Sequence, residues 1–269
     1  MTTSAKPLAV VTGGAGFIGS HMVDVLIGRS FAVRVIDNFS GGHERNLAHL
    51  DGNPDLTIVN QDIRDLNPDD APFDSARFVF HFAGIGDIVP SIERPIDYMD
   101  INVQGTVKVL ECARAAGVEK LVYAASSSCY GLADVPTRED HPIDPKYPYA
   151  LSKYQGEQAA LHWQNVYGLP VNSVRIFNAY GTRVRTTGAY GAVFGVFFKQ
   201  KLAGKPFTVV GDGTQGRDFL YVTDVARAFL LRIQKRYGNN PYHNSMHGCD
   251  VMLHTHLFLT RFGLVNRLS

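Results

Sequence analysis

The residues in this sequence best suited to proton transfer are a tyrosine and a lysine four positions apart, preceded by a run of serines. Tyr149 and Lys153 form a Tyr-x-x-x-Lys pair in a segment of helical period, and Ser126, Ser127 and Ser128 follow the apolar stretch KLVYAA. Positions four apart share a helix face, so we expect the ammonium group to lie near the phenol. A phenol is almost fully protonated at pH 7, and a nearby positive charge lowers its pKa. Tyr149 is therefore a candidate base that removes a hydroxyl proton as hydride leaves the same carbon.

A simpler interpretation is also open, in which the tyrosine and lysine are an ordinary surface pair and the serines only end a strand.

A glycine-rich loop earlier in the chain favours a catalytic role for these residues over the simpler interpretation. The first apolar run enters Thr12-Gly-Gly-Ala-Gly-Phe-Ile-Gly19, which has glycines at positions 13, 16 and 19. Such glycines allow a tight turn and a close approach of the backbone to a pyrophosphate at a helix N-terminus. The alternative is a tight turn without a ligand.

An acidic residue in the right place favours a dinucleotide in that loop. Asp37 ends the second apolar run, eighteen residues after Gly19. A carboxylate there accepts hydrogen bonds from an adenosine ribose and repels a 2′-phosphate, so we predict NAD and not NADP.

The elements that must position these residues alternate along the chain. Apolar and β-branched runs begin near Leu8, Ala32, Leu56, Phe78, Lys120 and Val171. Segments of helical period lie between them, over 19–29, 102–116 and 149–167. Most of the runs show no polar alternation, as expected for strands buried on both faces. The order predicts an α/β fold with a doubly wound parallel sheet of Rossmann type.

The rhythm changes after about residue 177 to glycine-rich connections with two further helical segments, 193–202 and 223–234. We expect an NAD-binding Rossmann domain over 1–176, a smaller and partial substrate-binding lobe over 177–235, and an atypical C-terminal tail over 236–269.

Composition narrows the class of partner and compartment. The 269 residues carry 26 Lys and Arg against 25 Asp and Glu, so no global charge favours nucleic acid or an anionic membrane. The three cysteines, Cys112, Cys129 and Cys249, are typical of reduced thiols. The chain lacks a signal-peptide pattern and any long apolar run, so we expect a cytoplasmic protein.

The stretch 8–234 resembles the extended short-chain dehydrogenase/reductase family, the NAD-dependent nucleotide-sugar epimerases and dehydratases, and within it the UDP-glucose and UDP-N-acetylglucosamine 4-epimerases. The motifs that carry the resemblance are TGGAGFIG, VIDNFSGG, QDIRD, HFAG, NVQGT, AASSSCYG, YPYALSK, VRIFNAYG and GDGTQGRDFLYVTDVA.

The resemblance implies a role for each matching residue. It assigns Tyr149, Lys153 and Ser126 to catalysis, with Ser126 and Tyr149 also touching the substrate beside Ser127. Asn178 and Arg217 match residues that hold the diphosphate of the nucleotide sugar. The implied cofactor-binding set is Gly13, Gly16, Phe17, Ile18, Gly19, Asp37, Asn38, Asp62, Ile63, Phe82, Ala83, Gly84, Asn102, Tyr149 and Lys153.

The implied reaction is epimerisation at C4 of a UDP-sugar through a transient 4-keto sugar, with tightly held NAD that is not consumed. Family dehydratases carry an Asp-Glu pair where Ser127 and Ser128 stand here, which disfavours 4,6-dehydration. Gly86 stands where many glucose-type epimerases have a lysine, which weakens the case for UDP-glucose and leaves a UDP-N-acetylhexosamine or a UDP-uronate equally open. Family members often form homodimers through the helices of Asn102 and Tyr149, so we expect a homodimer.

The C-terminal tail over 236–269 suggests other functions. Residues after about 235 resemble a fragment of a cyclic-nucleotide phosphodiesterase, with His243 as proton donor and His247 as metal ligand, and His254 and Asp250 lie nearby. A two-metal site needs ligands that this fragment lacks, so we predict no metal. Two alternatives to an active epimerase remain: an NAD-binding but catalytically impaired, truncated or chimeric homologue, and a metal-dependent phosphodiesterase.

Overall fold

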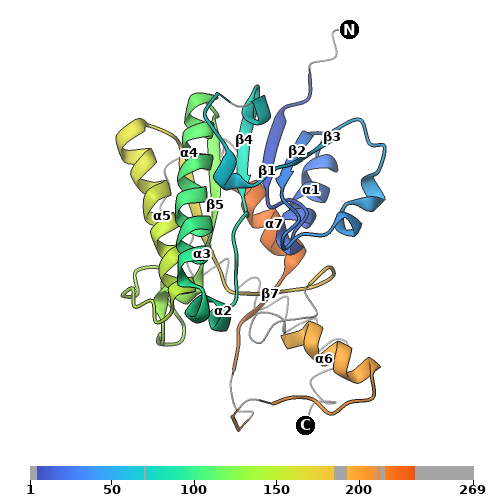
Figure 1. Ribbon diagram of the computed structural model, residues 1–269, viewed down its shortest axis with the longest axis vertical. Helices are drawn as coiled ribbons and strands as arrows, with labels where there is room; N and C mark the ends of the chain where they lie inside the picture. Colours follow the sequence, from blue (N-terminus) through green and yellow to red (C-terminus); the bar gives the residue numbers. More distant parts are fainter. Residues whose placement is uncertain (1–4, 70, 185–192, 210, 213–215, 234–269) are drawn as a thin grey trace. The chain divides into compact units, whose positions relative to one another are not determined.

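A parallel sheet of six strands forms the centre of the protein (Figure 1). The computed structural model describes residues 5–69, 71–184, 193–209, 211–212 and 216–233. The strand order is β3-β2-β1-β4-β5-β6, so the direction of winding reverses between β1 and β4, and the predicted α/β Rossmann fold is confirmed. The strands are β1 (Leu8–Thr12), β2 (Ala32–Asp37), β3 (Leu56–Asn60), β4 (Ala76–His81), β5 (Lys120–Ser126) and β6 (Val171–Ile176).

Five of the six strands begin where the sequence predicts, and β4 begins two residues earlier than Phe78, at Ala76. At the C-terminal ends of the central strands, Thr12 of β1 lies beside Ile36 of β2 and His81 of β4. Ligands of open parallel sheets bind outside these ends at the point where the winding reverses. The loops after β1, β2 and β4 therefore meet at the edge of the sheet where a site is expected.

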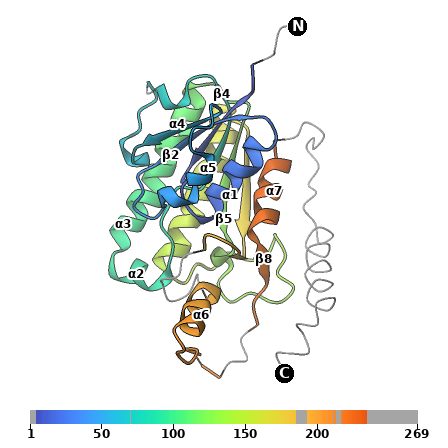
Figure 2. The ribbon, with the colours of Figure 1, turned by 90° about the vertical axis from the view of Figure 1, so that its right-hand side faces the viewer.

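Helices cover both faces of the sheet (Figure 2). On one face, α4 and α5 pack with Val10 and Ile36 in one core cluster. On the other face, α1 and α7 pack with Val11 in a second cluster. The alternation of Val10 and Val11 follows the period of two of a strand. The helices are α1 (Phe17–Ile27), α2 (Ile88–Glu93), α3 (Pro95–Met99), α4 (Thr106–Ala115), α5 (Pro148–Tyr167), α6 (Val193–Leu202) and α7 (Val222–Leu231).

The helix predicted over 102–116 is interrupted in the structure. A π-helical turn, η5 (Asp100–Gly105), joins α3 to α4. Gly105 lets another segment approach this turn, because a Cβ there would lie 2.6 Å from Cδ1 of Ile63. Short 3-10 turns occur at η1 (Glu44–Asn46), η2 (Ala48–Leu50), η3 (Ile63–Asp65), η4 (Ala71–Phe73) and η6 (Ser127–Tyr130).

A second, two-stranded parallel sheet begins within the apolar run that starts near Val171. The run divides into β6 and β7 (Asn178–Tyr180), and β7 pairs with β8 (Phe219–Tyr221). The helix α7 that follows lies in the core cluster of α1, through residues such as Phe229. The proposed division into domains at residue 176 stays a prediction.

Among the described residues, none of the helices combines the length and apolar character needed to cross a bilayer. Cys112 and Cys129 are buried free thiols, and Cys249 lies outside the described residues. Ala133–His141 clusters apart from the main unit of the chain. Within this segment, the Thr137 hydroxyl donates to the Asp134 carbonyl over 2.9 Å.

Candidate active site

The glycine loop joins β1 to α1 as predicted. Gly13 has a φ of +69°, and a Cβ there would lie 2.6 Å from the backbone nitrogen of Ala83 after β4. A Cβ on Gly19 would lie 2.1 Å from the carbonyl oxygen of Gly13. No side chain caps α1 at Gly16, and its first turn, which begins Phe17-Ile18, carries no acidic residue. The N–H groups of this turn have no intrahelical partner, so the loop suits the phosphates of a dinucleotide.

The carboxylate of Asp37 is tied to the glycine loop. Its Oδ2 accepts a hydrogen bond of 2.9 Å from the backbone of Ala15, and its Oδ1 accepts one of 2.9 Å from the backbone of Phe39. Asp37 is 7% exposed. The structure therefore places the residue expected at the adenosine ribose directly against the loop expected at the phosphates.

Asp62 and Ile63, which the family resemblance assigns to the adenine, follow the end of β3 and differ in orientation. Hydrogen bonds from Arg64 are the main cause that holds the pKa of Asp62 down at about 2. The neighbouring Ile63 is buried and its side chain packs toward Gly105. Its side chain is part of the core, so a contact of Ile63 with a base has to come from its backbone.

The loop after β4 connects the glycine loop to the lysine on α5. The ring of Phe82 packs on Phe229 of α7, with centroids 4.6 Å apart, so Phe82 faces the core. Gly84 has a φ of +157°, and a Cβ there would lie 2.8 Å from Oδ1 of Asn102 and 3.9 Å from Nζ of Lys153. A side chain at this position would therefore collide with Asn102, whereas the distance to Lys153 is an ordinary contact.

The side chain of Asn102 holds this loop to α5. Its Oδ1 accepts a hydrogen bond of 2.8 Å from the backbone N–H of Ile85, and its Nδ2 donates to the Ile85 carbonyl over 3.0 Å. The same Nδ2 donates to Oγ of Ser152 over 3.0 Å. Asn102 is thus engaged with protein groups beside the expected cofactor.

The structure brings Tyr149 to Ser126 and places Lys153 on the same helix as Tyr149. The Tyr149 hydroxyl donates to Oγ of Ser126 over 3.4 Å, and Ser126 Oγ lies 2.8 Å from Ser128 Oγ. Lys153 follows Tyr149 by one turn of α5, and its Nζ lies 4.5 Å from the ring centroid of Tyr123. Tyr149 therefore meets a hydroxyl group at the C-terminal end of β5.

Burial is the main cause of the pKa shifts of Tyr149 and Lys153. Burial raises the pKa of Tyr149, and the hydrogen bond with Ser126 opposes that rise. Burial lowers the pKa of Lys153 to about 8, and the negative charge of Glu157 opposes that fall. Burial therefore leaves the pKa of Tyr149 above its ordinary value, and a positive charge beside the phenol would lower it.

His81, the last residue of β4, is a buried histidine to which the sequence analysis gave no role. His81 Nδ1 lies 2.6 Å from the Thr12 hydroxyl and His81 Nε2 lies 2.9 Å from the Thr106 hydroxyl. Thr106 donates its only hydroxyl proton to the Asn102 carbonyl over 2.7 Å, so His81 carries its proton on Nε2. The motif HFAG contained this histidine, but its partners come from two other elements.

The residues expected at the substrate diphosphate lie in the second sheet. Asn178 of β7 donates through Nδ2 to the carbonyl of Asp218 over 2.9 Å. Arg217 is exposed just before β8, and its Nη1 donates to the Gly216 carbonyl over 2.7 Å. The two residues are far apart in sequence, and the pairing of β7 with β8 brings their segments together.

The histidines of the tail, His243, His247 and His254, lie outside the described residues, as does Asp250. Within the described part of the chain, no group of three or more His, Cys, Asp or Glu side chains is arranged to hold a metal ion.

Comparison with known proteins decides the family. Residues 9–244 match the family model described as the NAD dependent epimerase/dehydratase family. The chain belongs to this epimerase/dehydratase family. It is therefore an NAD-dependent enzyme, as the glycine loop and Asp37 predict. The match takes in His243, and it gives no support to the phosphodiesterase resemblance of the tail.

Members of the epimerase/dehydratase family that resemble this chain differ in their reactions. The UDP-glucose 4-epimerase of Mycolicibacterium smegmatis is 37% identical over 225 residues, which cover 82% of this chain and 71% of that protein. The UDP-N-acetyl-alpha-D-glucosaminuronate decarboxylase of Bacillus cytotoxicus is 33% identical over 237 residues, 86% of this chain and 72% of that protein.

A solved structure agrees with the fold. The UDP-N-acetylglucosamine 4-epimerase of Methanobrevibacter ruminantium, in complex with UDP-N-acetylmuramic acid, superposes with a TM-score of 0.80 at 33% identity. The match covers 85% of this chain and 73% of that one.

Proposed function

We propose that this chain catalyses NAD-dependent epimerisation at C4 of a UDP-sugar through a transient 4-keto sugar. The observation that carries the proposal is the contact of the Tyr149 hydroxyl with Ser126 Oγ, over 3.4 Å, on the helix that also brings Lys153 to Gly84. A proton acceptor, a hydroxyl group and a cofactor-binding loop thus meet at one end of the sheet.

Each of the three catalytic candidates has a distinct task. Tyr149 removes the proton of the 4-hydroxyl group and later returns it. Ser126 hydrogen-bonds the same oxygen and orients it toward the phenol. Lys153 contributes positive charge beside the cofactor. NAD, held by the glycine loop and Asp37, would supply the hydride acceptor for C4, and inversion requires that the 4-keto sugar turn its other face to the cofactor before the hydride returns.

The remaining candidates hold the two ligands in place. The glycine loop binds the cofactor phosphates, Asp37 and Asn38 bind the adenosine ribose, and Asp62 with the backbone of Ile63 binds the adenine. Ala83, Gly84 and Asn102 line or support the cofactor. Asn178 and the guanidinium of Arg217 bind the diphosphate of the sugar nucleotide, and Ser127 assists Ser126.

We extend the proposal to a homodimer that forms through α4 and α5. Analytical ultracentrifugation tests this proposal by measuring the mass of the particle in solution.

A UDP-sugar decarboxylase is the second candidate, because a relative with that reaction is 33% identical over 86% of this chain. Gly86 bears on the choice of sugar, since a Cβ on this residue would meet nothing within 4 Å. The space beside Gly86 is compatible with a sugar that carries an N-acetyl or a carboxylate group.

The test is to incubate the full chain, without added cofactor, with UDP-glucose, UDP-N-acetylglucosamine and UDP-glucuronate, and to identify products by NMR. We expect the C4 epimer of at least one substrate. Release of carbon dioxide with a UDP-pentose would instead identify a decarboxylase, and a 4-keto-6-deoxy sugar would identify a dehydratase.

Replacing the proposed base separates catalysis from cofactor binding. Tyr149→Phe removes the phenol oxygen and keeps the ring, so we expect turnover to disappear while NAD remains bound. Epimerisation by the variant at the wild-type rate would refute the role of Tyr149.

A further inference from the structure

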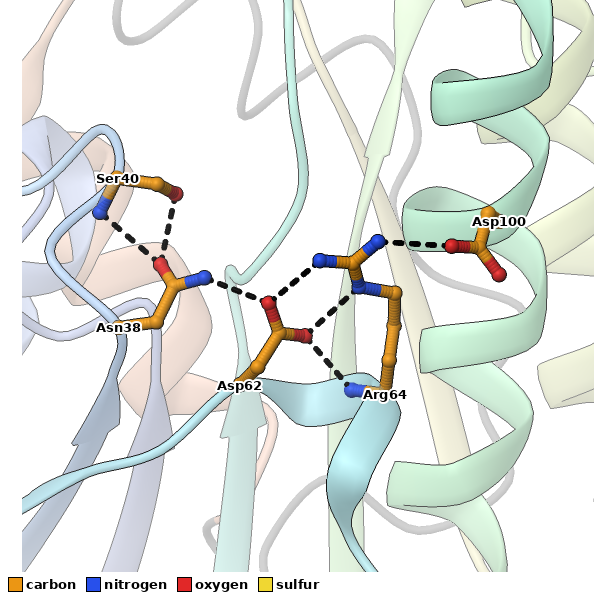
Figure 3. A network of polar contacts seen from close by, with 5 residues as sticks. All are labelled: Asn38, Ser40, Asp62, Arg64 and Asp100. Carbon is orange, nitrogen blue, oxygen red and sulfur yellow. Dashed lines mark hydrogen bonds and ion pairs between the residues drawn. The ribbon is translucent and has the colours of Figure 1, made fainter.

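Arg64 grips the carboxylate of Asp62 with three hydrogen-bond donors (Figure 3). Its backbone N–H and its Nε donate to Oδ1 over 2.9 and 3.0 Å, and its Nη2 donates to Oδ2 over 2.9 Å. Such a fork of parallel bonds fixes a carboxylate in both position and plane. The orientation of Asp62 is therefore set by a residue to which sequence reasoning gave no role.

The other end of Arg64 is anchored to the π-helical turn. Its Nη1 donates to Oδ2 of Asp100 over 2.8 Å, and Asp100 is the first residue of η5. The same turn contains Asn102, which holds the loop after β4 (Figure 3 shows Asp100 on its helix). Arg64 thus connects the end of β3 with the turn that holds the loop after β4.

The fourth donor to Asp62 is of a different kind. Asn38 donates through Nδ2 to Oδ2 over 2.7 Å, and its own Oδ1 accepts from the backbone and the hydroxyl of Ser40. A carboxylate offers about four acceptor sites, and these four donors fill them. The Asn38 amide is held by one bond to Asp62, whereas Arg64 is held by three. An incoming N–H donor therefore replaces the Asn38 hydrogen bond to Asp62 or shares its acceptor oxygen, and the three hydrogen bonds from Arg64 remain.

We propose that Arg64 is the positioning residue of the adenosine end of the site. It fixes the orientation of the Asp62 carboxylate and keeps it ionised, so that the carboxylate can only accept hydrogen bonds. Asp62 then selects a base that presents an exocyclic amine to it over a base that presents a carbonyl. The inference rests on the proposed function, in which Asp62 meets the adenine. It agrees with the pKa of Asp62, which the hydrogen bonds of Arg64 hold at about 2. An ionised carboxylate cannot donate, so a carbonyl oxygen set against it is an unpaired acceptor beside a negative charge.

The test compares the binding of two dinucleotides, NAD and nicotinamide hypoxanthine dinucleotide, to the full chain freed of nucleotide. The second ligand has a carbonyl in place of the adenine amine. We expect the wild-type chain to bind NAD about tenfold or more tightly than the hypoxanthine analogue. Arg64→Met should weaken NAD binding by about tenfold and leave the analogue nearly unchanged, so that the preference disappears.

Two further variants sharpen the comparison. Arg64→Lys keeps the charge and loses the fork, so it should fall between the wild type and Arg64→Met. Arg77→Met is the matched control, because Arg77 also pairs with a carboxylate, Glu119, and the two arginine side chains are 41% and 40% exposed. This control should leave both affinities unchanged.

The outcomes are distinguishable. If the wild-type chain binds neither dinucleotide, the proposed function fails. If it binds NAD but Arg64→Met keeps the wild-type preference, the inference about Arg64 is overturned. Equal weakening of both ligands by Arg64→Met, with a lower melting temperature, would also overturn it, because Arg64 would then act only on the stability of the fold.

Discussion

Ser126 is the residue whose contacts most directly relate the structure to the proposed chemistry. Its Oγ lies within 3.4 Å of the Tyr149 hydroxyl and 2.8 Å from the Ser128 hydroxyl. A group that orients the reacting hydroxyl toward the base contributes to the chemical step more than to binding. The hydroxyl of Ser126 should therefore affect kcat and leave KM nearly unchanged.

Ser126→Ala should lower kcat by about 100-fold, within the range expected for a group that acts in proton transfer. The matched control is Ser127→Ala, which removes the same atom one residue away and should lower kcat by less than about tenfold. Steady-state kinetics on the substrate found by the NMR panel measures both. Equal losses in the two variants would contradict the assignment of Ser126.

The position of Tyr149 and Lys153 on one helix could be predicted from the sequence, but their surroundings could not. The spacing of Tyr149 and Lys153 predicted a shared helix face, and both lie on α5. A lowering of the phenol pKa by nearby positive charge stays a prediction, whereas the structure shows a burial that raises the pKa of Tyr149. Burial depends on elements distant in sequence, so a spacing rule within one helix does not predict it.

At the scale of elements, a buried ion pair joins α5 to β6. Arg175 Nε lies 3.0 Å from Oε2 of Glu157, and the side chains are 21% and 5% exposed. Ser173 donates to Oε1 of the same carboxylate over 2.8 Å, and Arg175 Nη1 donates to the Tyr130 hydroxyl over 2.7 Å. The pair therefore fixes α5 on the sheet and on the turn after Ser126.

Arg175→Met should destabilise the fold by about 3 kcal/mol, because it leaves the Glu157 carboxylate buried without its partner. The double variant Glu157→Gln with Arg175→Met removes both charges and should recover most of that loss. Urea unfolding followed by circular dichroism gives the free energies. A double variant as unstable as the sum of its single variants would show that the pair is not the cause.

Elements with a strong apolar pattern could be predicted, and short or irregular ones could not. The strands β1 to β6 follow from runs of apolar residues, and helix α5 follows from a segment of helical period. The π-helical turn η5 was missed because the apolar pattern of a helix does not distinguish an i+4 from an i+5 hydrogen bond. The break at Phe177 was missed because β7 is defined by its partner β8, which is distant in sequence.

At the scale of the whole molecule, a buried neutral histidine makes stability depend on pH. Burial lowers the pKa of His81 from 6.5 to about 3 and is the main cause of the shift. The unfolded chain binds a proton near pH 6.5, but the folded chain does so only near pH 3. Unfolding therefore takes up a proton between these values, and this effect reduces stability as the pH falls below about 6.5.

The free energy of unfolding should fall by about 1.4 kcal/mol per pH unit for this one group below pH 6.5. Denaturant unfolding at pH 7, 6 and 5 measures the slope. His81→Asn should reduce the slope by about that amount, and the exposed control His162→Asn should not. A slope unchanged by His81→Asn would contradict this interpretation.

In the proposed reaction, hydride leaves C4 of a UDP-sugar and returns to the same carbon. The most direct test uses a UDP-sugar labelled with deuterium at C4, incubated with the full chain in ordinary water. We expect a C4 epimer that retains the deuterium at C4, with no exchange with solvent, and no product from Tyr149→Phe. Deuterium lost to water, or found at C6, would contradict the proposed reaction.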